Sequence, residues 1–309
     1  MFSIDRLILE MKKKKSAICL GLDPFLEKIP LRFIEEGEYY FGKSISAYSY
    51  AVLQFNKKVL EICKDKVAAV KPQFSLYVKL GVEGILTFKN TIQFAKELGL
   101  IVIIDAKSND IDSSMEGYVD GFIGKSTIKG IEFTAFDGDF LTVNPYLGTD
   151  SFKAIKKVID KYEKGAFVLV KTSNPSSFDF QDKIINSDIK DKPLYWHVAK
   201  RVADFFSGYE TKNSFLPVGI VTGATMPEQL KILREEFPNL FFLIPGYGTQ
   251  GGSIDSLSKI AAINCGFVVN ASRSILYSYL DKYKYLDFEQ AILKSIDEMN
   301  DELNKVIRY

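Results

Sequence analysis

Short apolar runs alternate with longer amphipathic segments along nearly the whole chain. Eight of the runs are rich in β-branched and aliphatic residues, and several are almost continuously apolar, a pattern typical of parallel strands buried on both faces. The runs that we predict to be strands are 17–22, 67–71, 101–105, 140–144, 166–171, 217–222, 240–244 and 265–270.

The longer segments carry apolar residues at the spacing of one helix face. They cover residues 46–63, 84–98, 151–162, 194–206, 227–236, 254–263 and 288–306. No Pro- or Ser-rich linker divides the chain, and no short repeat is present. Eight βα units in an undivided chain predict an α/β fold, a closed (β/α)8 TIM barrel that forms a single domain over residues 1–309.

Polar and glycine residues gather directly after the predicted strands. Lys71 ends the second strand, Asp105 ends the third, and Arg273 follows the eighth. The carboxyl ends of all strands meet at the barrel face that carries active sites, so we expect these side chains to share one mouth. Glycine, proline, asparagine and aspartate are also ordinary turn residues. Turn formation does not explain the lysines and the arginine at these positions, because a partly buried cation needs a charged or polar partner.

The composition argues against several classes of protein, namely those that bind nucleic acid, span a membrane or carry a signal peptide. The 309 residues are 47% hydrophobic and 26% charged, an ordinary globular balance. The formal net charge of +1 gives no indication of a nucleic-acid or membrane surface. No apolar run approaches the length of a membrane span, and the first residues lack the apolar stretch of a signal peptide. We therefore expect a cytoplasmic protein that binds neither nucleic acid nor membrane.

Cysteine and histidine are scarce. The three cysteines lie far apart without a CxxC pair, which argues against a disulfide framework or a structural zinc site. The single histidine, His197, lies in a predicted helix, and a histidine-rich metal site cannot be built from it. We expect packed thiols and no metal site.

The most specific local motif is DxKxxD, formed by Asp105, Lys107 and Asp110. Residues two apart on a strand share a face, so Asp105 and Lys107 should both face the barrel mouth. The motif alone also fits a surface loop with Asp110 as a helix N-cap. Lys71 on the preceding strand favours function, because alternating lysines and carboxylates keep one another charged despite partial burial.

A second signal follows the last two predicted strands. Residues 245–252 are rich in glycine, and residues 270–273 end in Arg273. Barrels that bind phosphorylated ligands frequently hold the phosphate with the loops after strands seven and eight. Glycines let backbone amides approach an anion, and arginine adds charge-assisted hydrogen bonds. The alternative is a flexible loop beside a solvated arginine.

These pieces together resemble the orotidine 5'-monophosphate decarboxylase family, in particular its longer subgroup from some bacteria and apicomplexan parasites. The matching motifs are GLDP, the lysine of VKPQ, DAKSND, TVNPYLG, VLVKTSNP, PGYGTQGG and NASR. They run in order from Cys19 to Arg273, over nearly the whole chain. The resemblance implies decarboxylation of orotidine 5'-monophosphate to UMP, the last step of de novo UMP synthesis, without a metal or organic cofactor.

The resemblance also implies a role for each charged residue. Asp23 would bind the ribose hydroxyls, and Lys71 would touch ribose and orient Asp105. Asp105 would face the substrate carboxylate, and Lys107 would give a proton to C6 of the pyrimidine. Asp110 would come from the other subunit of a homodimer with shared active sites.

Further substrate contacts are implied for Ser114, Ser173, Pro245, Gln250 and Arg273. Ser173 would read the edge of the pyrimidine, and Gln250 and Arg273 would bind the phosphate. The chain departs from the family pattern beside the site. Gln73 stands where several members have asparagine, and residues 108–109 are Ser-Asn instead of Arg-Gly.

Two other functions are compatible with the motifs. One is a related barrel decarboxylase that acts on a sugar-acid phosphate, shares DxKxxD and uses magnesium. Lys71 counts against it, because a metal site would favour a carboxylate at that strand end. The other is a nucleotide-binding barrel that has lost activity, whose signature would be a broken charge array. The array of this chain is intact in sequence.

Overall fold

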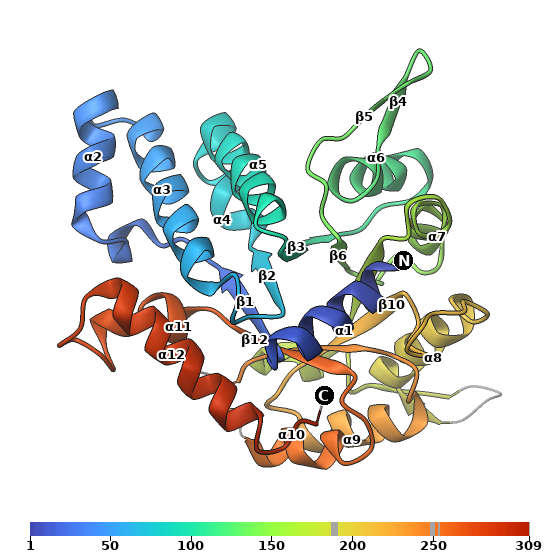
Figure 1. The fold of residues 1–309 in the computed structure, drawn as a ribbon. Coiled ribbons are helices and arrows are strands. Elements are labelled where there is room, and N and C mark those ends of the chain that lie inside the picture. Colours follow the sequence, from blue (N-terminus) through green and yellow to red (C-terminus); the bar gives the residue numbers. More distant parts are fainter. Residues whose placement is uncertain (187–190, 248–250, 253, 309) are drawn as a thin grey trace.

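The computed structural model describes residues 1–186, 191–247, 251–252 and 254–308, and eight parallel strands close into a barrel (Figure 1). The strands are β1 (Ile18–Leu22), β2 (Ala69–Pro72), β3 (Ile101–Ser108), β6 (Phe140–Val143), β7 (Gly165–Lys171), β10 (Val218–Thr222), β11 (Phe242–Pro245) and β12 (Phe267–Ala271). Neighbours in the barrel follow chain order, and β12 pairs with β1 to close it. The predicted (β/α)8 barrel is confirmed, because each strand overlaps one of the predicted runs.

Helices surround the barrel (Figure 1). The longer ones are α1 (Ser3–Lys14), α2 (Leu31–Phe41), α3 (Ile45–Cys63), α5 (Gly81–Glu97), α6 (Asp112–Phe122), α7 (Asp150–Tyr162), α8 (Leu194–Phe205), α9 (Pro227–Glu236), α10 (Ile254–Ala261) and α12 (Phe288–Leu303). Two short helices, α4 (Phe74–Val78) and α11 (Arg273–Leu276), directly follow β2 and β12. Helices α2 and α6 were not predicted: α2 buries Phe33 and Gly37 alone, and α6 contains two glycines that weaken its helical pattern.

Helix α1 closes the end of the barrel at which the strands begin. The apolar face of α1 is buried. On the same helix, Nη2 of Arg6 lies 2.6 Å from Oδ1 of Asp139, the residue that directly precedes β6. The other oxygen of Asp139 accepts a hydrogen bond from the backbone of Val102 at 2.8 Å. This end is therefore filled by a helix and an ion pair, and the opposite end is left to carry a site.

Aromatic rings fill the interior of the barrel. The ring centroids of Phe140 and Phe167 lie 5.0 Å apart. Two glycines make room for them: a Cβ on Gly165 would lie 2.5 Å from the Phe140 ring, and one on Gly219 would lie 2.7 Å from the Phe167 ring. The barrel is thus a packed core, as expected for this fold, and a ligand can bind only at its mouth.

Two hairpins interrupt the regular alternation. The strands β4 (Ser126–Ile128) and β5 (Ile131–Phe133) project between α6 and β6 (Figure 1). The strands β8 (Ile184–Ile185) and β9 (Lys192–Pro193) lie in the connection from β7 to α8. Each helix in the described part of the chain is too short or too polar to cross a membrane.

Candidate active site

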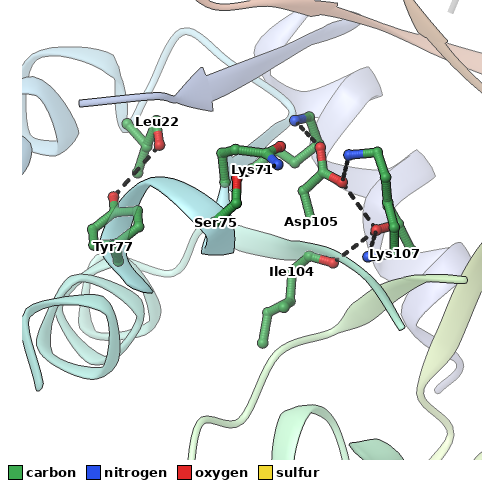
Figure 2. A network of polar contacts seen from close by, with 9 residues as sticks. Leu22, Lys71, Ser75, Tyr77, Ile104, Asp105 and Lys107 are labelled. Atoms are coloured by element: carbon green, nitrogen blue, oxygen red, sulfur yellow. Dashed lines mark hydrogen bonds and ion pairs between the residues drawn. The ribbon is translucent and has the colours of Figure 1, made fainter. Parts of the chain in front are cut away.

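The carboxylate of Asp105 lies between two lysines at the carboxyl ends of β2 and β3. Its Oδ2 accepts a hydrogen bond from Nζ of Lys71 at 2.5 Å, and its Oδ1 accepts one from Nζ of Lys107 at 2.6 Å. Figure 2 shows this arrangement, with an ammonium group on each side of the carboxylate. The three residues meet because β2 and β3 are neighbouring parallel strands.

The three charged groups differ in burial. The side chains of Lys71 and Asp105 are 6% and 9% exposed, whereas that of Lys107 is 45% exposed. Burial alone would lower the pKa of Lys71, but the Asp105 carboxylate and, more weakly, Asp23 hold that pKa above its ordinary value. Burial would likewise raise the pKa of Asp105, yet the two ammonium groups hold it well below its usual range. The buried pair is therefore ionised at neutral pH.

Lys107 lies at an irregularity in β3. Between two points of pairing with β6, β3 advances from Ile104 to Ser108 while β6 advances only from Leu141 to Val143. Inside this bulge, the backbone of Lys107 adopts the left-handed region with φ at 47°. Its amide donates a hydrogen bond to Oγ1 of Thr142 at 2.9 Å. The bulge allows Asp105 and Lys107 to converge, so regular strand alternation alone does not explain their meeting.

Asp110 does not join the array within its own chain. Its carboxylate accepts a hydrogen bond from the backbone amide of Ile111 at 2.8 Å, and it makes no ion pair with any described residue. Residues 109–111 precede α6 and are partly or fully exposed. The structure therefore brings together three of the four predicted catalytic residues: Lys71, Asp105 and Lys107.

A cavity of about 410 Å³ opens above these charged groups. A volume of this size suits a small organic ligand. Lys71, Asp105 and Lys107 line it together with Thr142, Leu169, Thr172, Ser173, Asn174, Gln181, Val221, Leu243, Pro245 and Asn270. Two of the predicted substrate-binding residues, Ser173 and Pro245, are thus beside the charged array.

The other predicted substrate-binding residues lie at different places. Asp23 follows β1, and its Oδ1 is buried without a hydrogen-bond partner among the described residues. Ser114 is exposed on the first turn of α6, and Arg273 is exposed at the start of α11. Arg273 lines a separate cavity of about 420 Å³ with Lys28 and other residues. Gln250 lies outside the described residues.

Residues that commonly bind metals do not gather near this site. Across the described part of the chain, no group of three or more histidine, cysteine, aspartate or glutamate side chains is arranged to hold a metal ion. Cys19, Cys63 and Cys265 are free thiols, and the first two are buried.

Comparisons with known proteins identify the family. The sequence profile of the orotidine 5'-phosphate decarboxylase / HUMPS family matches residues 16–286. The chain belongs to this family. It is 36% identical over 304 residues to the orotidine 5'-phosphate decarboxylase of Caldicellulosiruptor bescii, covering 98% of both chains. It is 37% identical over 265 residues to that of Rhodopirellula baltica, covering 85% of this chain and 84% of the relative.

Solved structures agree with this membership. The Leishmania donovani OMP decarboxylase superposes with a TM-score of 0.68 at 26% identity, covering 99% of each chain. The structure of the putative orotidine-monophosphate-decarboxylase from Plasmodium yoelii gives a TM-score of 0.77 at 22% identity, covering 98% of each chain, and shows the shared fold. The resemblance to a decarboxylase family is confirmed.

Several residues around the cavity were not among the predicted site residues. Thr142 is the first residue of the TVNPYLG motif but was given no role of its own, and its hydroxyl donates to Oδ1 of Asp105 at 3.0 Å. Gln181 lies in a long connection and binds Thr172 through both ends of its amide. By contrast Lys171, a strand-end lysine, is buried and pairs with Asp182 at 2.8 Å, away from the cavity lining. Two signals for Thr142 were available in the sequence: its place in the TVNPYLG motif and its position near the end of a predicted strand.

Proposed function

We propose that the chain decarboxylates orotidine 5'-monophosphate to uridine 5'-monophosphate and CO2 on one catalytic domain spanning residues 1–309. The observation that carries this proposal is the Asp105 carboxylate held between the Lys71 and Lys107 ammonium groups, which line a ligand-sized cavity together. The names of the bacterial relatives support the same substrate. No metal ion or organic cofactor takes part in the proposed reaction.

The charges of the array suit a substrate that carries a carboxylate. With all three groups ionised, Lys71, Asp105 and Lys107 together carry one net positive charge. A substrate carboxylate beside Asp105 would be repelled by that group and attracted by the exposed Lys107 ammonium. Departure of CO2 removes the repulsion and leaves the Lys107 attraction in place. The array therefore favours the state after carbon–carbon bond cleavage over the bound substrate.

Lys107 supplies the chemistry at the reacting carbon. Loss of CO2 from C6 leaves a carbanion in the ring plane that no neighbouring carbonyl can delocalise. Its stabilisation must be electrostatic and preorganised, which an ammonium fixed by Asp105 provides. The same ammonium then gives a proton to C6 and completes UMP. Lys71 holds the other side of Asp105 and keeps that carboxylate in place.

The remaining residues bind the nucleotide. Ser173 reads the pyrimidine edge and Pro245 packs beside it, since both line the cavity. The buried, unpartnered Oδ1 of Asp23 is free to accept from a ribose hydroxyl. Gln250 and Arg273 hold the phosphate. The binding energy of this remote group lowers the barrier by ordering the site.

The active unit is a homodimer with shared sites. Asp110 and Ser114 are both at the surface, before and at the start of α6. Asp110 pairs with no cation of its own chain among the described residues. In the dimer Asp110 completes the array of the neighbouring chain, where its charge brings the four groups to neutrality. A cytoplasmic location remains a prediction.

The first test is turnover with and without a chelator. Purified protein mixed with orotidine 5'-monophosphate should deplete the absorbance of this substrate at the same rate in the presence and absence of EDTA. Loss of turnover on chelation, with restoration by magnesium, would instead favour a metal-dependent decarboxylase of a sugar-acid phosphate. Tight nucleotide binding without turnover would indicate a barrel that has lost activity.

A further inference from the structure

Thr142 connects the backbone of Lys107 to the carboxylate that the same lysine contacts. The Lys107 amide donates to Thr142 Oγ1 at 2.9 Å, and the Thr142 hydroxyl lies 3.0 Å from Oδ1 of Asp105. That same Oδ1 accepts from Lys107 Nζ at 2.6 Å. The contacts form a closed ring that begins at the Lys107 backbone and returns to its ammonium group.

The hydroxyl can make both contacts of the ring at once. It has one hydrogen to donate and lone pairs to accept. It accepts from the Lys107 amide and donates to Asp105, because the alternative acceptor, the carbonyl oxygen of Ile104, lies farther away at 3.5 Å. Thr142 is 2% exposed, so water does not compete for these bonds. Asp105 then has three donors: Lys71, Lys107 and Thr142.

The bulge in β3 explains why the lysine needs such support. Inside it, pairing between β3 and β6 is interrupted from Ile104 to Ser108, so the Lys107 amide has lost its regular ladder partner. The left-handed conformation of Lys107 is also unfavourable for a residue with a side chain and persists only where its surroundings impose it. The Thr142 hydroxyl replaces the missing acceptor at this point.

We propose that Thr142 is a positioning residue that fixes Lys107 over the reacting carbon, through its amide and through Asp105. This inference rests on the proposed function, in which Lys107 stabilises and protonates C6. Thr142 lines the cavity, but its hydroxyl is engaged by the Lys107 amide and by Asp105, so in this proposal it acts through those two groups and gives no proton to the substrate. Its loss should therefore slow the chemical step and leave nucleotide binding nearly unchanged.

The test compares Thr142→Val, which keeps the shape without the hydroxyl, with Thr142→Ser, which keeps the hydroxyl. For Thr142→Val we expect kcat to fall by roughly ten- to a hundredfold, the scale of a small misplacement of a catalytic group, with KM changed less than about threefold. Thr142→Ser should stay within about threefold of wild type in kcat, because the ring can still form.

Thr87→Val is the matched control. Thr87 is also buried, and its hydroxyl makes one hydrogen bond to the carbonyl oxygen of Ser49, on helices away from the barrel mouth. It should lose stability as Thr142→Val does, without the drop in kcat. The inference is wrong if Thr142→Val keeps the wild-type kcat or if Thr142→Ser is as slow as Thr142→Val. It is also wrong if kcat of Thr87→Val falls as much as that of Thr142→Val.

Crystal structures of wild type and Thr142→Val separate this inference from the proposed function. We expect Lys107 in the variant to leave the left-handed region or its Nζ to lose contact with Asp105. An unchanged Lys107 would overturn the positioning role whether or not the enzyme is active. A wild-type protein without turnover would instead overturn the proposed function, and the crystal comparison would still decide whether Thr142 holds Lys107.

Discussion

At the scale of single residues, the proposed chemistry depends on holding a lysine and a carboxylate in charged contact. Asp105 is buried and has a lowered pKa, so it stays ionised and gives Lys107 a fixed partner. Lys71 is buried on its other side and cannot reach the open cavity as freely as Lys107, whose side chain is 45% exposed. In the proposed reaction the two lysines therefore differ in role: Lys71 orients the carboxylate and Lys107 meets the substrate.

This difference predicts the effect of Lys107→Ala. Turnover should fall by at least about a thousandfold, because the variant loses both a preorganised charge at the developing anion and the proton donor, each worth roughly a hundredfold or more. Binding of UMP should survive, since its phosphate and ribose contacts involve other residues. Turnover and UMP affinity, measured by absorbance and calorimetry, check the two halves of the prediction.

Lys231→Ala provides the control for removing a lysine. Lys231 has a similar exposure of 48% and also pairs with a carboxylate, that of Glu235 on the same helix, α9. It should keep wild-type turnover. Turnover by Lys107→Ala close to that of the control would end the assignment of Lys107 as proton donor.

At the scale of elements, the junction from β12 to α11 carries the proposed phosphate contact. Arg273 is the first residue of α11, is exposed, and makes no ion pair with any described residue. Its guanidinium is thus available to an anion beside the barrel mouth. In this conformation, however, it lines a cavity separate from the one above Asp105. Phosphate binding would require the side chain to turn toward the nucleotide.

Arg273→Ala should therefore weaken the binding of phosphorylated ligands and leave the binding of unphosphorylated ones nearly unchanged. We expect UMP to lose about 2 kcal/mol of binding free energy, roughly thirtyfold in Kd, as for loss of a charged hydrogen bond. Uridine never makes the contact and should bind nearly as before. Arg201→Ala, at another exposed arginine on α8, should affect neither ligand. Equal losses for UMP and uridine would mean that Arg273 acts structurally.

The individual strands, helices and site contacts also show how much of the fold and of the site could be predicted from the sequence. The barrel strands followed from their apolar runs, because strands buried on both faces leave a continuous signal. Helix α2 buries too few residues to show a clear stripe, and two glycines weaken the helical pattern of α6. The contacts of Thr142 depend on a bulge that brings β3 and β6 into an irregular register, which no local pattern encodes. The meeting of Asp105 and Lys107 was predicted from spacing, but the bulge and left-handed backbone that achieve it were not.

At the scale of the whole molecule, the proposed array takes its fourth charged group, Asp110, from a second chain. Asp110 lies between the end of β3 and the start of α6, and it does not line the cavity beside Asp105. This position is compatible with the proposed contact between Asp110 and the site of a neighbouring chain. Two-fold symmetry would then give two equivalent shared sites.

Hybrid dimers test this arrangement. A Lys107→Ala chain and an Asp110→Ala chain, each inactive alone, are co-expressed with different tags so that the hybrid can be purified. If Asp110 acts across the interface, one site of the hybrid lacks both groups and the other has both, so activity should return to about half that of wild type. A purified hybrid as inactive as its parents would show that Asp110 acts within its own chain.

The most direct measurement of the central claim follows the reaction in D2O. Because the proposed proton on C6 comes from an ammonium group that exchanges with solvent, orotidine 5'-monophosphate should yield UMP with one deuterium at C6 and one equivalent of CO2. NMR and mass spectrometry of the product detect both. Recovery of unchanged substrate would contradict the proposed activity, and UMP without deuterium at C6 would contradict protonation by Lys107.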